Sequence, residues 1–184
     1  MKKALTLLTL TCALFATSAS ASVLITGFGT GQFSQTTSTF GTNTQTATTY
    51  QIVGTDFGNA IYGDLPTSVD ISGSNFSLTL TGTLASPVSS SFQINLFDAN
   101  GNDRLYQGTF SAFTVGVETS VTLTFVNQTG SFDDHVISIG LITTGIGSPL
   151  DLTLDTLIAI PEANSIALLG MGVAGLLARR RFKR

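Results

Sequence analysis

The sequence predicts an all-β protein, an antiparallel β-sandwich of jelly-roll type that is flanked by two terminal segments. In the central part of the chain Thr, Ser, Gly, Val, Ile and Phe dominate, and no apolar residues recur at helical spacing. Several runs alternate apolar and polar residues with a period of two, which is typical of strands with one packed face. Eight or more such short runs, with Gly, Asn and Asp between them, favour a sandwich.

The strongest alternation lies at residues 76–81, 92–96, 121–125 and 150–155, and we expect a strand at each. Weaker strands are expected at 23–28, 50–57, 105–110 and 136–142. A tight hairpin is expected at 98–103, because Asn100-Gly101 favours left-handed backbone angles. The segment 31–49 is mostly Thr, Ser, Gln and Gly. It predicts exposed strands with a loop near Gly41, and a mobile loop is the alternative.

The N-terminus has the three parts of a signal peptide. Lys2-Lys3 is basic, residues 4–15 are apolar, and small residues follow at Ala19 and Ala21. We expect cleavage after Ala21, which makes residues 1–21 the leader and Ser22 the new N-terminus. A retained anchor is the alternative, but the apolar run is shorter than the roughly 20 residues that a membrane span needs.

The C-terminal segment, residues 161–184, has the features of a short membrane anchor. Pro161-Glu162-Ala163 precedes an apolar stretch, which a basic cluster follows. Such a stretch is just long enough for a short membrane helix, and the cations hold that end in the cytoplasm. The expected helix residues are Ile166, Ala167, Leu168, Leu169, Gly170, Met171, Gly172, Val173, Ala174, Gly175, Leu176 and Leu177, and the basic residues are Arg179, Arg180, Arg181, Lys183 and Arg184.

Residues 22–160 form one segment of ordinary domain size, and its charge limits what it binds. Its ten acidic side chains face a single cation, Arg104, so its net charge is about −9. Nucleic acid is therefore excluded as a partner, because phosphate binding needs clustered cations. The segment has no cysteine, since Cys12 lies in the leader, so packing and sheet hydrogen bonds must stabilise it.

The search for chemical sites yields weak candidates only. The oxygen-rich loop with Asp98, Asn100, Asn102 and Asp103 would suit calcium, but it lacks EF-hand spacing, and turn chemistry explains it as well. His135 adjoins Asp133 and Asp134, yet neighbours on a strand point to opposite faces. Asp151 and Asp155 share a strand face and imitate a glycosidase pair, although solvated acids are commoner. We therefore predict no catalytic residues, no firm metal site and no cofactor, with calcium as the alternative.

The C-terminal segment resembles the PEP-CTERM sorting domain of Gram-negative bacteria. Pro161 and Glu162 match the first two motif residues, while Ala163 replaces the second proline. Matches continue through the spacer and helix at Ser165, Ala167, Leu168, Leu169 and Gly170, and end at Arg179, Arg180 and Arg181. The resemblance implies export, temporary tethering in the inner membrane, cleavage by an exosortase near Pro161, and delivery to the cell surface or matrix, often in bacteria that make exopolysaccharide.

For the domain itself we expect a non-enzymatic surface or matrix protein that contacts exopolysaccharide. Its partners would be signal peptidase, an exosortase, the membrane and that polysaccharide. Tyr50, Tyr62 and Tyr106 are the tyrosines available for stacking on sugars, since the chain has no Trp. The alternatives are a secreted or membrane-tethered hydrolase, glycoside-active or metal-dependent, and a calcium-dependent carbohydrate-binding module. A pocket that holds two close carboxylates would favour the hydrolase.

Overall fold

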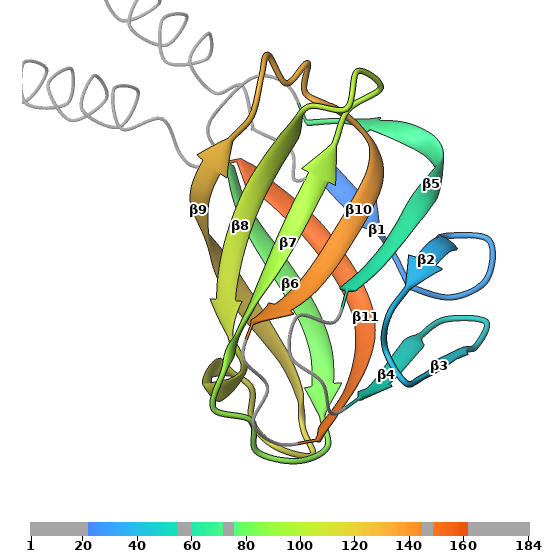
Figure 1. Cartoon of the computed structure of the whole chain (residues 1–184), viewed down its shortest axis with the longest axis vertical. Helices are drawn as coiled ribbons and strands as arrows, with labels where there is room; N and C mark the ends of the chain where they lie inside the picture. Colours follow the sequence, from blue (N-terminus) through green and yellow to red (C-terminus); the bar gives the residue numbers. More distant parts are fainter. Residues whose placement is uncertain (1–21, 55–59, 72–75, 145–148, 162–184) are drawn as a thin grey trace, which may run out of the picture. The chain divides into compact units, whose positions relative to one another are not determined.

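The computed structural model describes residues 22–54, 60–71, 76–144 and 149–161, which are almost entirely β-structure (Figure 1). Within these residues the regular elements are strands and one short 3₁₀ helix. The elements are β1 (Ser22–Ile25), β2 (Ser34–Ser38), β3 (Thr42–Gln45), β4 (Tyr50–Gly54), β5 (Ala60–Asp70), β6 (Phe76–Leu84), β7 (Ser91–Phe97), β8 (Asp103–Thr109), η1 (Phe110–Ala112), β9 (Glu118–Gln128), β10 (His135–Thr144) and β11 (Leu150–Pro161).

The strands form one curled antiparallel sheet that folds into two layers, as predicted. The layer called sheet B has the order β2-β5-β10-β7-β8-β9, and the layer called sheet A has the order β9-β6-β11-β4-β3, with β1 also paired to β11. Strand β9 belongs to both layers: Leu123 pairs with Leu78 of β6, whereas Thr124 pairs with Gln107 of β8. In Figure 1, β8, β7, β10 and β5 lie in front of β6 and β11.

The core lies between the two layers and is built from one face of each alternating run. Strand β6 alternates buried and half-buried residues along its whole length, beginning with the buried Phe76. Strand β7 alternates in the same way, but begins with the half-buried Ser91. Aromatic rings fill one end, where the Phe92 ring lies 5.0 Å from that of Phe110 and 6.1 Å from that of Phe113. Among the described residues, the apolar side chains with no exposed surface are Ile52, Leu78, Leu80, Phe92, Ile94, Leu96, Phe110, Val136, Leu150, Leu152 and Leu157.

The structure adds to the sequence-based predictions in two places. Strand β5, which runs beside β10 in sheet B, was not expected, because its second half has no clear alternation. The polar segment 31–49 contains two short, largely exposed strands, as predicted, but they belong to opposite layers: β2 pairs with β5 and β3 with β4. The loop expected near Gly41 lies between these two strands and ends at Gly41, because β3 already begins at Thr42.

The sandwich begins and ends next to the two predicted processing sites. Ser22 is the first residue of β1, and Pro161 is the last residue of β11. Ala19, Ala21, Glu162, Ala163 and the predicted tail helix lie outside the described residues. Among the residues that are described, no helix is long and apolar enough to cross a membrane.

Candidate functional site

The outward face of sheet B carries a mixed polar and aromatic surface. Its position follows from strand register, because alternate residues of a strand point to opposite faces. While Ile61, Ile94 and Ile139 point into the core, their neighbours in sequence point outward. Across β5, β10, β7 and β8 the paired outward positions form two rows: Tyr62, Gly140, Asn95 and Leu105 in one, and Asp64, Ser138, Phe97 and Asp103 in the next.

Two aromatic rings lie over the glycine in the middle of this face. Gly140 pairs with Tyr62 on one side, and a Cβ at Gly140 would lie 2.7 Å from Cε1 of Tyr62 and 3.4 Å from Cε2 of Phe97. The missing side chain therefore provides the space that these rings occupy. The two ring centroids are 6.0 Å apart with an interplanar angle of 53°. We call this pair, which is half-buried, the Tyr62–Phe97 platform.

The other two tyrosines do not contribute to this surface. Tyr50 is 1% exposed and Tyr106 is 2% exposed, so the expectation that they could stack on sugars was wrong. Tyr50 donates its hydroxyl hydrogen bond to Oε1 of Gln35, and burial raises its pKa to about 12. Tyr50 faces the core because it lies two residues from the buried Ile52 on β4 and pairs with the buried Leu154 of β11. Tyr106 faces the core beside the buried Ile94, its partner on β7, and neither partner is evident from the sequence alone.

Amide side chains surround the platform. Asn95 donates from Nδ2 to Oδ2 of Asp103 at 2.8 Å, which fixes the orientation of its amide. Its Oδ1 is buried and has no hydrogen-bond donor among the described residues. Gln93 and Gln107 face each other on β7 and β8, one step further along the same face. The alternation of residues 92–96 predicted that Gln93 and Asn95 face solvent. That they lie near Tyr62 follows from the register in which β5, β10 and β7 pair, and the sequence does not show this register.

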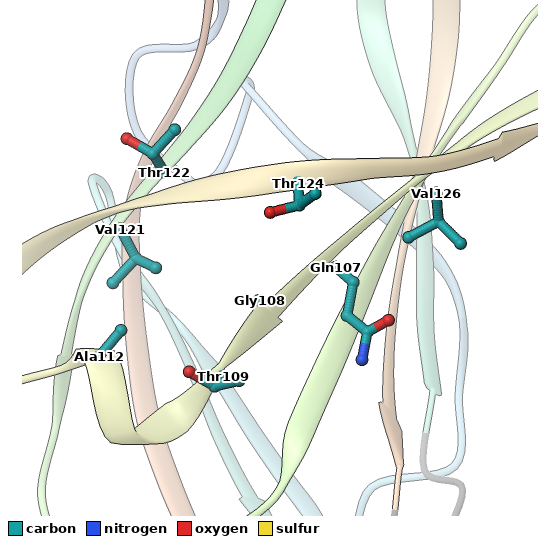
Figure 2. Close-up of a pocket in the computed structure, with 8 residues that line it drawn as sticks. All are labelled: Gln107, Gly108, Thr109, Ala112, Val121, Thr122, Thr124 and Val126. Atoms are coloured by element: carbon teal, nitrogen blue, oxygen red, sulfur yellow. The ribbon is translucent and has the colours of Figure 1, made fainter.

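A shallow groove continues this face where β8 meets β9. It has a volume of about 300 Å³ and is lined by Gln107, Gly108, Thr109, Ala112, Val121, Thr122, Thr124 and Val126. Figure 2 shows the Gln107 amide extending from β8 beside Val126, with Thr124 and Thr122 on the neighbouring strand. Uncharged side chains alone line the groove, so it offers hydrogen bonds and apolar contact but no general acid or base.

The loop that offered calcium as an alternative forms the predicted turn between β7 and β8, and the carboxylate of Asp98 is hydrogen-bonded within the protein. Asp98 is 2% exposed, and it accepts hydrogen bonds from the backbone N–H groups of Asn100, Asn102 and Asp133 and from Nδ2 of Asn102. Burial alone would raise its pKa, but these hydrogen bonds outweigh it, and the pKa of Asp98 is lowered. Asp103 accepts from Asn95 and Thr129. Turn chemistry therefore accounts for these ligand candidates.

The other candidate residues, Asp151, Asp155 and His135, lie in separate surroundings. Asp151 accepts a hydrogen bond from Gln51 at 2.8 Å. Burial, and to a smaller extent the charge of Glu118, raises the pKa of Asp155. His135 contacts the backbone carbonyl of Asp133 through Nδ1 at 3.0 Å. Within the described residues, no group of three or more His, Cys, Asp and Glu side chains is arranged to hold a metal ion.

Arg104, the one cation of the 22–160 segment, is also held within the fold. Its NH1 lies 2.6 Å from Oδ1 of Asp134, and its Nε donates to Oε1 of Gln128 at 2.8 Å. The guanidinium carbon lies 4.7 Å from the centre of the Phe132 ring and 5.6 Å from that of Phe76. Its charge is therefore neutralised at the edge of the sandwich, and the rest of the surface stays acidic.

Comparison with known proteins identifies a motif in the C-terminal segment and shows the fold of the sandwich. The PEP-CTERM protein-sorting motif matches residues 159–181, which confirms the sorting signal that the sequence predicted. The sandwich is similar in fold to a carbohydrate-binding module. No curated protein matches the sequence.

Solved structures that are similar in fold include a carbohydrate-binding module, an agarase and PfGH50B. The family 11 carbohydrate-binding module from Clostridium thermocellum, in complex with a β-1,3-1,4-mixed-linked tetrasaccharide, is 13% identical with a TM-score of 0.51, and the match covers 80% of this chain and 99% of that one. An agarase, AgWH50C, is 14% identical (TM-score 0.55; 72% of this chain, 23% of that chain). PfGH50B is 7% identical (TM-score 0.58; 78% and 24%). The chain thus spans about a quarter of the length of the latter two.

Proposed function

We propose that this chain is a non-enzymatic exported protein that an exosortase-type system processes and delivers to the surface or extracellular matrix of a Gram-negative bacterium, where it associates with exopolysaccharide. The observation that carries the proposal is the sorting motif at 159–181, which starts at the last residues of the sandwich's final strand. A short motif placed directly after a folded domain leaves that domain intact when the tail is removed. The uncut chain is then an inner-membrane intermediate.

The association with polysaccharide is supported by the fold and by the outward face of sheet B. The family 11 module, which shares this fold, was solved with a bound tetrasaccharide. On the present chain, the Tyr62–Phe97 platform and its surrounding amides offer stacking and hydrogen bonding without charge. The non-enzymatic assignment is supported by Asp98 and Asp151, whose carboxylates already accept hydrogen bonds from the protein.

Mass spectrometry of the secreted form tests the processing part of the proposal. The full chain is expressed in a Gram-negative host that has a matching exosortase and in the same host without it. We expect a product that begins at Ser22 and ends near Pro161 in the first host, and a tailed, membrane-associated form in the second. Glu162→Gln should reduce processing, while Glu118→Gln serves as a matched control. Intact Arg184 in cell-free matrix would contradict sorting.

Sedimentation with purified exopolysaccharide tests the second part. The secreted protein is mixed with insoluble exopolysaccharide from the same strain, and bound protein and newly formed reducing ends are both measured. We expect the protein to sediment with the polysaccharide and the number of reducing ends to stay constant. Release of reducing ends would assign the chain to the hydrolases instead.

A further inference from the structure

We propose that the outward face of sheet B is the surface on which this protein binds a neutral polysaccharide chain, with the Tyr62–Phe97 platform as its stacking element. The inference deepens the proposed function and rests on it. The platform is formed by residues of two strands that are not neighbours, and both rings lie over Gly140 on the strand between them. Because the two ring planes are 53° apart, at most one of the rings lies parallel to a sugar above the sheet, and the other contacts it at an angle.

The polar groups next to the platform are suited to hydroxyl groups. Asn95 holds Asp103 through its Nδ2, which leaves its Oδ1 as an acceptor that lacks a donor. Buried polar atoms without a partner are rare in folded proteins and need an explanation. Because Oδ1 is itself enclosed, a sugar hydroxyl or a bridging water would provide the missing donor once the side chains above it move aside on binding. Gln93 and Gln107 add side-chain amides, each with donors and an acceptor, toward the groove between β8 and β9.

The surface is long enough for several sugar units. The outward positions run from Tyr62 on β5 across β10, β7 and β8 to Thr124 on β9. With neighbouring strands about 4.8 Å apart, this distance is about 19 Å. A chain that crosses the strands would contact the platform at one end and, at the other end, the Gln107 groove, which Figure 2 shows. We therefore expect binding to internal segments of a polymer and weaker binding to single sugars.

The negative charge of this surface favours a neutral polysaccharide over an acidic ligand. Asp64 and Asp103 flank the platform, and the segment 22–160 carries about nine net negative charges. An acidic polysaccharide would be repelled, and so would a second copy of this chain that presents the same face. A neutral polysaccharide avoids both penalties, because its hydroxyl groups pair with amides and its apolar ring faces pair with Tyr62 and Phe97.

Affinity electrophoresis of the secreted protein tests the proposal. The gels contain mixed-linkage β-1,3-1,4-glucan, agarose, the neutral fraction of the strain's own exopolysaccharide, or alginate as an acidic comparison. We expect retardation by at least one neutral polymer and none by alginate. Tyr62→Ala and Phe97→Ala should each weaken the apparent Kd about tenfold or more, while Tyr62→Phe keeps the ring and most of the binding. Phe125→Ala is the matched control, since this aromatic side chain is 52% exposed and contacts Tyr106 instead.

Circular dichroism and thermal unfolding first establish that each variant is folded, and Gln107→Ala provides a second test should Phe97→Ala fail to fold. If wild-type protein binds a neutral polymer but the platform variants bind it equally well, this surface is wrong while the proposed function stands. If wild type binds only alginate, the inference of a neutral-polysaccharide surface is wrong while the association with polysaccharide stands. If it binds no polysaccharide, both are wrong. If the protein dimerises and Tyr62→Ala abolishes only the dimer, the surface joins copies of the chain instead.

Discussion

Ser22 and Ala159 are paired residues on the adjacent strands β1 and β11. The first is the N-terminus expected after signal cleavage, and the second lies two residues before Pro161 of the sorting motif. Val23 pairs with Ile158, and Leu157 and Ala159 are almost completely buried. The two predicted cleavage sites therefore lie just outside one strand pair, and we expect cleavage at either to leave that pair intact.

This pairing limits where the sorting cut can fall. A chain that ends at Thr156 loses Leu157 and the partners of β1, so we expect it to be less stable by about 3 kcal/mol or more, because a fully buried leucine is removed. A chain that ends at Pro161 should be as stable as one with the tail. Urea unfolding of the two truncated chains measures the difference. Equal midpoints would show that the end of β11 does not stabilise the sandwich.

The sequence predicts the strands of the sandwich well where one face of a strand is buried and the other is not, because apolar and polar residues then alternate along it. In β6 every second residue from Phe76 to Leu84 is buried, so the period of two is complete and visible. The same holds for β7, and the sorting motif is equally visible because it is a continuous local pattern. These features depend on neighbours in sequence and need no knowledge of the partner strand.

The candidate site is less visible because it depends on register between distant strands. Tyr62, Gly140 and Phe97 meet only when β5, β10 and β7 pair as they do, and none of the three has a distinctive sequence context. Tyr50 and Tyr62 look alike in sequence, yet one is buried and the other half-buried. The double role of β9 is similarly hidden, since it depends on a change of partner at Leu123 and Thr124.

Arg104 should be important for stability despite being charged. Its side chain is 19% exposed, lies against Phe132 and Phe76, and pairs with Asp134. We expect Arg104→Met to cost about 2 kcal/mol, because Asp134 then loses its partner while part of the packing remains. Arg104→Lys should give an intermediate loss, since lysine keeps the charge but not the planar group. A double-mutant cycle with Asp134→Asn, followed by urea unfolding, measures the coupling, and additive effects would contradict it.

Asp98 should contribute to stability in a way that depends on pH. Its folded pKa is lowered from the usual 3.8, because the hydrogen bonds to Asn102, Asn100 and Asp133 outweigh burial. A carboxyl with a lowered folded pKa stabilises the protein above pH 3.8, and this stabilisation is lost as the pH falls through the folded pKa. Asp98→Asn should therefore unfold more easily at pH 7 and show a shallower decline below about pH 4. Asp64→Asn, an exposed position, is the control, and identical pH profiles for Asp98→Asn and wild type would refute the assignment.

Asp155 should destabilise the folded protein at neutral pH, which is the opposite of the effect of Asp98. Burial, with a smaller contribution from Glu118, raises its folded pKa above the usual 3.8. The charged form is then disfavoured in the folded state, so stability decreases as the pH rises from 3.8 through the raised value. Asp155→Asn should raise the melting temperature at pH 7 and remove this part of the decline. Glu118→Gln should give a smaller gain, because it leaves the burial of Asp155 unchanged. Asp64→Asn is the control, because it removes one negative charge at an exposed position. If Asp155→Asn raises the melting temperature no more than Asp64→Asn does, the burial of Asp155 does not destabilise the protein.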